Sequence, residues 1–226
     1  PMNWLEVLKT VFSLSLLYST IRISISILFA GMGEMITERS GVLNIGVEGI
    51  MLMGAFAATW VTLAFPEWPW YLMMPALFLS SFLVGGLWAM LAGLLKSVWN
   101  ISEIITTLMM NYIAALWIRY LVQGPWRDPG LVMYPFSPEL PPAARLPTLG
   151  ETRIHLGLVL AVVAAVILVF IFKRTRWGYE IRVIGSNAST ARYAGMRLVR
   201  NALLTMLISG GLSGLAGMAE LSGVFY

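Results

Sequence analysis

Long apolar runs separated by short polar connections make up most of this chain. Six runs approach or exceed the roughly 20 apolar residues that a helix needs to cross a hydrocarbon core of about 30 Å. The strands of a membrane barrel would instead alternate polar and apolar residues over about ten positions, and no such alternation is present. The pattern predicts an all-α bundle of about six transmembrane helices, at residues 10–30, 44–65, 71–95, 103–122, 154–172 and 202–222.

Composition agrees with a membrane protein and excludes several kinds of chemistry. Hydrophobic residues make up 58% of the chain, charged residues make up 12%, and the mean hydropathy is +0.80. The absence of cysteine excludes disulfides, thiol catalysis and cysteine-based metal sites. The sequence also contains no GxxxxGK[ST] phosphate loop, no GxGxxG motif and no zinc motif. We therefore expect one transmembrane domain over residues 1–226, which is not an enzyme and holds no metal or cofactor.

Charge is distributed unevenly between the connections, and this predicts the orientation. The connection at 173–200 carries seven basic residues against one acidic residue, Glu180, so the positive-inside rule places it in the cytoplasm. It has too few aromatic residues to favour nucleic-acid binding. The connection at 123–153 has balanced charges and seven of the eleven prolines, and we expect it outside, as a lid, a docking surface or a plain connector. Counting spans back puts the N-terminus outside, unless a broken or re-entrant segment restores an internal one.

Two polar residues interrupt the second apolar run, ERSGVLNIGVEGIMLMGAFA at 38–57. An ionised carboxylate near the centre of a bilayer costs a few kcal/mol even on lenient scales. We therefore expect Asn44 and Glu48 to face protein or a water-filled path. Glu48 lies near the expected start of its helix, where the helix dipole would stabilise it. A structural role and a substrate contact both remain open for it.

A second polar stripe begins in NISEIITTLMMNY at 100–112. Glu103, Thr107 and Asn111 recur at helical spacing, so we expect them on one face of a span. Asn100 and Glu103 have the spacing of a capping box. Because Asn and Thr within membranes often only join helices by hydrogen bonds, Asn111 either joins two helices or lines a substrate path.

Other polar and small residues within the runs give further expectations. Arg22 lies in the first run and needs either a partner, for which Glu34 and Glu48 are candidates, or a snorkelling route to the membrane surface. His155, the only histidine, is expected at the membrane interface. Small residues four positions apart predict close helix packing, either within the chain or across a dimer. These residues are Gly85, Ala89, Gly93, Gly210, Ser213, Gly214 and Gly217.

The cytoplasmic connection contains a short helix of its own, in GSNASTARYAGM at 185–196. Asn187 is a good N-cap for a helix over residues 188–194, and Gly195 suits the left-handed position that follows a helix. Ala188, Ala191 and Ala194 recur every third residue and form a face of small side chains. A helix resting on lipid would instead carry Trp, Phe or Leu on that face. The pattern favours docking into a protein partner.

Several segments in order carry a family resemblance: ERSGVLNIGVEGIMLMGAF, EIITTLMMNYIA, GSNASTARYAGM and SGGLSGLAG. Together they resemble the permease subunits of bacterial ABC importers for branched-chain amino acids, simple sugars and nucleosides. Ribose-type sugar permeases usually have a GGIDLSVG-like segment where this chain has GVLNIGVEG, so the resemblance leans toward the nucleoside branch. Such permeases usually continue through further spans, which implies a chain truncated at its C-terminus.

The resemblance also implies roles for the residues that match the family's motifs. The family's NIG-EG and E-I-TT-MMNY segments fall on residues expected near a substrate pathway, which are Asn44, Glu48, Glu103, Thr107 and Asn111. Its cytoplasmic coupling segment falls on residues expected to couple the chain to an ATPase, which are Gly185, Asn187, Ala188, Ala191, Ala194 and Gly195.

The mechanism implied by the resemblance is alternating access in the bacterial cytoplasmic (inner) membrane. An extracellular lipoprotein would deliver a nucleoside or simple sugar to a pair of permease subunits. Cytoplasmic ABC ATPases, which bind ATP and Mg, would drive the conformational change. The expected partners are the ATPase, a second permease subunit, the substrate-binding lipoprotein and the lipid bilayer, but no nucleic acid.

Two other classes stay open. An ion- or proton-coupled secondary transporter would use Glu48 or Glu103 as its coupling site and would need no ATPase. A membrane scaffold subunit would have no pathway of its own.

Overall fold

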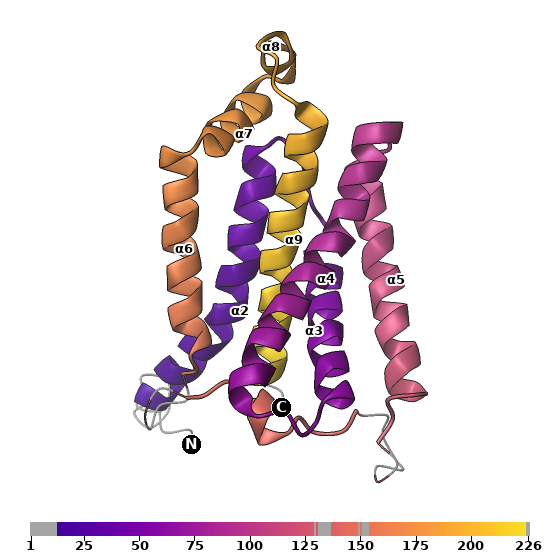
Figure 1. The fold of residues 1–226 in the computed structure, drawn as a ribbon, viewed down its shortest axis with the longest axis vertical. Helices are drawn as coiled ribbons and strands as arrows, with labels where there is room; N and C mark the ends of the chain where they lie inside the picture. The colour runs from indigo at the N-terminus through magenta and orange to yellow at the C-terminus, as the bar shows by residue number, and fades with distance from the viewer. Residues whose placement is uncertain (1–12, 129, 131–136, 149, 151–153, 225–226) are drawn as a thin grey trace, which may run out of the picture.

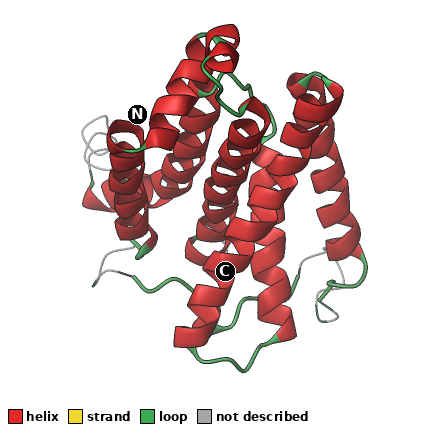
Figure 2. Cartoon of the chain, turned by 45° about the horizontal axis from the view of Figure 1, so that its top comes forward, coloured by secondary structure: helices red, strands yellow, loops and turns green. Residues whose placement is uncertain are grey.

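The computed structural model describes residues 13–128, 130, 137–148, 150 and 154–224. Within these ranges the regular secondary structure is helical, with loops between the helices (Figure 2). The one strand-like feature there is an isolated bridge between Thr148 and His155. The elements are α2 (Leu14–Arg39), α3 (Val47–Ala64), α4 (Trp70–Trp99), α5 (Glu103–Gln123), the 3-10 helix η1 (Pro142–Ala144), α6 (Gly157–Arg174), α7 (Arg176–Ser186), α8 (Ala188–Tyr193) and α9 (Leu198–Gly223).

Six of these helices, α2 to α6 and α9, are long and apolar enough to cross a membrane. This confirms the predicted all-α bundle of six spans. The largest difference is at α2, which continues to Arg39 through residues that we expected to form a connection. Residues 32–39 contain no proline and a single glycine, Gly33. The helix therefore continues beyond its apolar part. Residues 10–12, where the first span was predicted to begin, lie outside the described residues.

Helix α9 lies at the centre of the bundle, and α2, α3 and α4 pack around it (Figure 1). In its most apolar stretch 67% of the residues are buried, against 17% in α5 and 22% in α6. The packing depends on glycines: a Cβ at Gly33 of α2 would lie 2.6 Å from the Ser209 carbonyl oxygen. A Cβ at Gly85 of α4 would lie 2.6 Å from the Gly210 carbonyl oxygen. The predicted small-residue repeats therefore pair α4 with α9 within the chain.

The connections collect at the two ends of the bundle (Figure 1). The links 40–46 and 100–102 lie at one end with α7, which crosses it, and with α8, which projects furthest from the bundle. The link 65–69, η1 and the end of α9 lie at the other end. This alternation is the one expected if the basic connection faces the cytoplasm. We call the two ends cytoplasmic and external on that basis, and the sidedness itself stays a prediction.

The turn between α4 and α5 differs from the predicted capping box. Asn100 ends α4 in the left-handed conformation with φ 54°, and Ser102 precedes α5 without a side-chain cap. Glu103 instead forms a hydrogen-bonded ion pair with Lys96 of α4. The capping-box prediction is therefore wrong. Asn tolerates left-handed backbone, so Asn100 ends one helix instead of starting the next.

The external end is held together by a contact between the start of α2 and the end of α9. Arg22 Nε donates to the Gly223 carbonyl at 2.8 Å, and Arg22 Nη2 donates to the Val224 carbonyl at 3.1 Å. A cation at the C-terminus of a helix meets carbonyls without helical partners and the negative end of the dipole. The described hydrogen bonds of Arg22 therefore reach the end of α9, and not the predicted partners Glu34 or Glu48.

His155 also differs from its prediction as an interfacial residue. Its side chain is 1% exposed, and its ring is so close to Gly157 and Gly223 that a Cβ at Gly157 would lie 2.6 Å from Nδ1. Nδ1 accepts a hydrogen bond from the Gly157 N–H at 3.2 Å, while the buried Nε2 has no partner among the described residues. Burial, and secondly the positive charge of Arg22, lower the pKa of His155 to about 4. The ring is therefore neutral at pH 7.

Candidate functional sites

Helix α3 begins inside the bundle instead of at its cytoplasmic end (Figure 1). The link 40–46 starts beside α7, where a Cβ at Gly41 would lie 3.2 Å from the Gly185 Cα. The link has no helical structure. At its end, Gly49 in the first turn of α3 is hydrogen-bonded to Asn111 of α5. At 1.5 Å per residue, Asn111 lies about 12 Å beyond the start of α5. The second span therefore begins with an irregular segment, residues 40–46, that runs beside the first turns of α5, and we call this arrangement the broken span.

Two side chains of α5 bind the backbone of this link, and we call Thr107, Asn111 and the backbone they bind the polar clasp. Thr107 Oγ1 accepts from the Ile45 N–H at 3.3 Å, and Asn111 Nδ2 donates to the Ile45 carbonyl at 3.2 Å. Asn111 Oδ1 accepts from the Gly49 N–H at 2.8 Å. The N-cap of α3 is Gly46, which has no side chain, so Asn111 caps α3 from the neighbouring helix. In lipid no water would replace these hydrogen bonds.

Asn44 stabilises the same link from within. Its side chain is 3% exposed, and its Oδ1 accepts from the Gly46 N–H at 3.0 Å, which holds the turn before α3. Its Nδ2 and the Nε1 of Trp88 have no hydrogen-bond partner among the described residues. Both side chains line a void of about 10 Å³. Asn44 therefore faces protein, which is one of the two environments that its sequence predicted.

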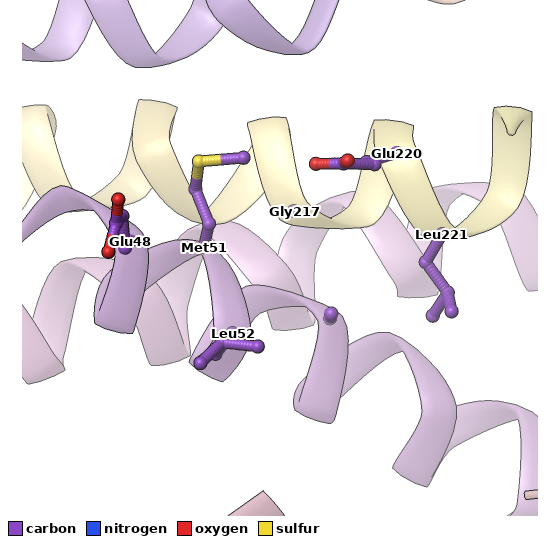
Figure 3. A pocket seen from close by; sticks show the side chains of 7 residues that line it. Glu48, Met51, Leu52, Gly217, Glu220 and Leu221 are labelled. Atoms are coloured by element: carbon purple, nitrogen blue, oxygen red, sulfur yellow. The ribbon is translucent and has the colours of Figure 1, made fainter. Parts of the chain in front are cut away.

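Glu48 belongs to a different site, a groove between α3 and α9 (Figure 3). We call this site the carboxylate groove. It has a volume of about 400 Å³ and is lined by Glu48, Met51, Leu52, Ala55, Gly217, Glu220 and Leu221. Glu48 is exposed and Glu220 is half-buried, and Figure 3 shows Glu220 extending toward Met51. Glu48 lies in the first turn of α3, where the helix dipole favours a negative charge, as the sequence indicated.

The two carboxylates determine what this face of the bundle can contact. A carboxylate that is ionised in lipid costs a few kcal/mol, so we expect the groove to face water or another protein chain. Among the residues that the sequence placed near a pathway, Glu48 lines the groove, Thr107 and Asn111 belong to the clasp, and Glu103 pairs with Lys96. Glu220 was not predicted. The sequence signal that could have identified Glu220 is that it is the single ionisable residue in the last apolar run, at 202–222.

The short helix α8 begins and ends as the sequence predicts. Asn187 Oδ1 accepts from the Thr190 N–H at 3.0 Å, which caps the start of the helix. Gly195 follows the helix with φ 76°, in the left-handed region. The helix itself spans Ala188–Tyr193, one residue shorter than expected.

The surface of α8 differs from the predicted face of three alanines. Ala188 and Ala194 are exposed, but Ala191 is 0% exposed because it packs against its own chain. The most prominent side chain is instead Tyr193, which is 96% exposed. Tyrosine is among the residues enriched at protein interfaces.

The base of α8 lies next to the link that leads into α3. A cavity of about 490 Å³ separates them and is lined by residues of the link, α4, α7, α8 and α9, among them Gly41, Lys96, Gly185, Asn187, Ala188 and Asn201. At Gly185 the backbones of α7 and the link are in contact, because a Cβ there would lie 3.1 Å from the Gly41 nitrogen. The contact between Gly185 and Gly41 therefore connects α7, which leads into α8, with the link that leads into α3.

With six helices long and apolar enough to cross a membrane, the chain is a multi-pass membrane protein. The chain belongs to the family described as branched-chain amino acid transport system / permease component, whose model matches residues 16–225. This confirms the resemblance drawn from the sequence motifs.

Individual relatives are transporter permeases. The chain is 37% identical over 210 residues to the guanosine ABC transporter permease protein NupP of Bacillus subtilis, and the match covers 91% of this chain and 60% of that protein. It is 34% identical to the glucose ABC transporter permease protein TsgB13 of Haloferax volcanii, over 88% of this chain and 55% of the relative. It is 29% identical to the nucleoside ABC transporter permease protein NupB of Lactococcus lactis, over 81% and 52%. The chain thus spans between 52% and 60% of the length of these relatives. No solved structure matches it.

Proposed function

We propose that this chain is the membrane-spanning subunit of an ATP-driven ABC importer and moves a nucleoside or simple sugar by alternating access. The carboxylate groove, found in a chain of the permease family, is the observation that carries the proposal. The relatives' names support the substrate class, since they specify guanosine, nucleosides and glucose. These molecules are rich in hydroxyl groups, and ionised carboxylates accept hydrogen bonds from hydroxyls.

In this proposal the substrate passes along the carboxylate groove. Glu48 and Glu220 accept hydrogen bonds from its hydroxyl groups, and the apolar wall at Met51 and Leu52 contacts its less polar face. The polar clasp does not contact the substrate. It fixes the start of α3 and thereby positions Glu48. Glu103 acts at the cytoplasmic end, where its ion pair with Lys96 joins α4 to α5.

Coupling to ATP hydrolysis would run through α8. The ATPase would bind the exposed surface that includes Ala188, Tyr193 and Ala194. A displacement of α8 would act on Gly185, which contacts the link at Gly41. Because the link continues directly into α3, the same displacement would move Glu48. The predicted coupling residues Asn187, Ala191 and Gly195 would keep α8 folded while it moves.

The proposal includes partners that supply what this chain lacks. ATP and Mg²⁺ would be bound by separate ABC ATPase subunits, since the sequence contains no phosphate loop. A second permease subunit would cover the open side of the carboxylate groove, and a lipoprotein would deliver substrate at the external end. The location would be the bacterial cytoplasmic membrane, with the basic connection inside.

Transport in reconstituted vesicles tests the proposal. The chain would be reconstituted with its ATPase, second permease and binding protein, and uptake of radiolabelled guanosine and glucose would be measured. We expect ATP-dependent uptake that falls about ten- to a hundredfold in Glu48→Gln and Glu220→Gln, because loss of a charged hydrogen-bond partner costs roughly 1.5 to 3 kcal/mol. The control Glu67→Gln changes an exposed carboxylate in the external link 65–69 and should leave uptake unchanged.

Two results would contradict the proposal. Uptake without any ATPase that disappears when ion gradients are dissipated would instead identify a secondary transporter. Normal uptake in both groove variants, with correctly folded protein, would remove the carboxylate groove from the pathway.

A further inference from the structure

A second cavity lies at the cytoplasmic end, between α7 and the start of α9. It has a volume of about 370 Å³ and is lined by Arg176, Trp177, Glu180, Gly195, Met196, Arg197, Arg200, Asn201 and Leu204. It shares Asn201 with the cavity beside α8 and no residue with the carboxylate groove. Neither the sequence motifs nor the proposed transport mechanism uses its three arginines.

The charges around this cavity are not balanced. In the part of the chain that the structure describes, none of Arg176, Arg197 and Arg200 forms an ion pair or a side-chain hydrogen bond. The one carboxylate of the wall, Glu180, accepts a hydrogen bond from Asn201 Nδ2 at 2.7 Å. Asn201 is 4% exposed, so this bond holds the carboxylate against the wall. Three exposed arginines and one carboxylate in the lining give this cavity a net positive charge, which favours an anionic ligand.

The backbone at this cavity adds to the positive potential. Helix α9 begins here after Arg197, and no side chain caps its first N–H groups. The free N–H groups and the dipole at the start of a long helix attract anions, phosphate in particular. Trp177 also lines the cavity, and its ring packs against the hydrophobic core of the bundle. Guanidinium groups and backbone N–H groups together match the oxygens of a phosphate group.

The position of the cavity indicates the source of that phosphate. Helix α6 ends in Lys173 and Arg174, so the chain leaves the apolar layer immediately before Arg176. Helix α7 then crosses the end of the bundle between α6 and α9 (Figure 1). Aromatic and basic residues at this level are typical of the layer of lipid headgroups. Met196 and Leu204 give the cavity an apolar part as well.

We propose that this cavity binds the phosphate group of an anionic membrane lipid at the cytoplasmic surface. The three arginines contact the phosphate oxygens, and Met196 and Leu204 contact the glycerol and the first part of an acyl chain. Basic residues near an anionic membrane surface each contribute about fivefold to binding. The bound lipid joins α7 to α9 and so fixes the base on which α8 stands.

Lipid binding can be measured on the full chain purified in mild detergent. Phosphatidylglycerol would be added at increasing mole fraction, with phosphatidylcholine as the neutral lipid and inorganic phosphate as the free anion. The readouts are the lipids retained in native mass spectra and the temperature of thermal unfolding. We expect phosphatidylglycerol to be retained and to raise the unfolding temperature by several degrees, while phosphatidylcholine and inorganic phosphate have no effect.

A pair of triple variants separates this site from general attraction between a basic surface and acidic lipid. Arg176→Gln, Arg197→Gln and Arg200→Gln together remove the three guanidinium groups of the cavity. The control triple variant Lys173→Gln, Arg174→Gln and Arg182→Gln removes the same charge from exposed positions of the same connection that do not line the cavity. We expect the first variant to lose at least about tenfold more affinity for phosphatidylglycerol than the control, because it removes charge-assisted hydrogen bonds to the phosphate as well as surface charge, whereas the control removes surface charge alone.

Several outcomes would overturn the proposal. Equal losses in the two triple variants would mean non-specific attraction, and equal stabilisation by inorganic phosphate would mean a site for free phosphate. Unchanged lipid retention with loss of ATPase binding in the cavity variant would assign the arginines to a protein interface. If the triple variant does not fold, the three single Arg→Gln variants are measured instead, and less than a twofold loss in each of them contradicts the proposal.

Discussion

Asn111 shows how one side chain can make a broken span possible. It bonds the Gly49 N–H with Oδ1 and the Ile45 carbonyl with Nδ2, so one amide satisfies a donor and an acceptor of irregular backbone. In an apolar environment each of these groups would cost several kcal/mol if it were left unpaired. The residue joins α3 to α5, which is one of the two roles that its sequence allowed.

Replacing Asn111 by Ala should loosen the start of α3. Two backbone groups lose their partners, and we expect a loss of about 2 to 6 kcal/mol in stability, from roughly 1 to 3 kcal/mol for each unpaired group. Hydrogen exchange measured by mass spectrometry on peptides covering 44–52 should become faster, with little change in α9. The same experiment on Thr107→Val, compared with Thr106→Val, isolates the clasp.

The two threonines form a matched pair. Thr107 accepts from the link at Ile45, whereas the described hydrogen bond of Thr106 stays within α5, to the Ser102 carbonyl. Exchange in 44–52 should therefore increase in Thr107→Val and not in Thr106→Val. Equal effects of the two changes would show that the clasp does not hold the link.

His155 predicts a specific pH dependence of stability. Its pKa is about 4 in the folded chain, chiefly because the ring is buried and secondly because Arg22 lies near, whereas an unfolded histidine titrates near 6.5. Below pH 6.5 the unfolded chain takes up a proton that the folded chain refuses, so this contribution to stability is complete above pH 6.5 and falls as the pH drops toward 4. The total loss is on the order of 3 kcal/mol.

The variant His155→Asn provides the comparison. Its Oδ1 can accept the hydrogen bond from the Gly157 N–H, but the side chain does not titrate between pH 4 and pH 6.5. Unfolding of the two proteins would be measured in detergent across that range. The stability of the variant should fall less steeply than that of the wild type, and parallel curves would contradict the assignment.

Sequence identified most of the polar residues that proved informative, but not what they contact. Asn44, Glu48 and Asn111 stood out because polar groups are costly in an apolar run. Their separation into a clasp and a groove depends on which helix lies beside α3, and no spacing within one run contains that information. Glu220 was missed for the same reason, since it gains its meaning only from Glu48 across the groove.

At the scale of the helices, glycines on three sides of α9 set how closely the bundle packs. A Cβ at Gly54 of α3 would overlap the backbone of Gly214, and the backbone cannot move aside without displacing a helix. Gly31 of α2 differs, because nothing lies within 4 Å of a Cβ built there. These two glycines are therefore a test and a matched control.

Gly54→Ala should lower the unfolding temperature and Gly31→Ala should not. The first change forces α3 away from α9 and should cost about 1 to 3 kcal/mol or more, as overpacked cores do. The second removes a flexible residue from a helix interior and should stabilise by roughly 0.5 to 1 kcal/mol. Thermal unfolding of both variants in the same detergent measures the difference, and equal effects would show that the close contact between α3 and α9 does not limit stability.

The helices themselves could be predicted well, because apolar length alone identifies a span. The exceptions lie where polarity and helix propensity disagree. The end of α2 is polar but helical, and the sequence around Asn100 and Glu103 suggested a cap where the structure has the end of one helix and an ion pair. The depth at which α3 begins was also not predictable, since it depends on Thr107 and Asn111 of a later span.

At the scale of the whole molecule, α8 is the part that a cytoplasmic partner can reach most directly. Ala188→Trp places a large side chain on the exposed surface of α8, and we expect co-purification with the ATPase to fall several-fold while the chain stays folded. Tyr179→Trp enlarges an exposed aromatic residue of α7 and should leave co-purification unchanged. Ala191 is unsuitable for this test, because its side chain is fully buried and a larger one would unfold α8.

The broken span also constrains the order in which the protein can be assembled. Asn111 follows Gly49 by 62 residues, so the ribosome completes α3 well before it makes the side chain that caps it. Until α5 enters the bilayer, the first N–H groups of α3 have no partner in lipid and must stay in contact with water or with the insertion machinery. We therefore expect helix α3 to reach its final depth only after α5 is inserted.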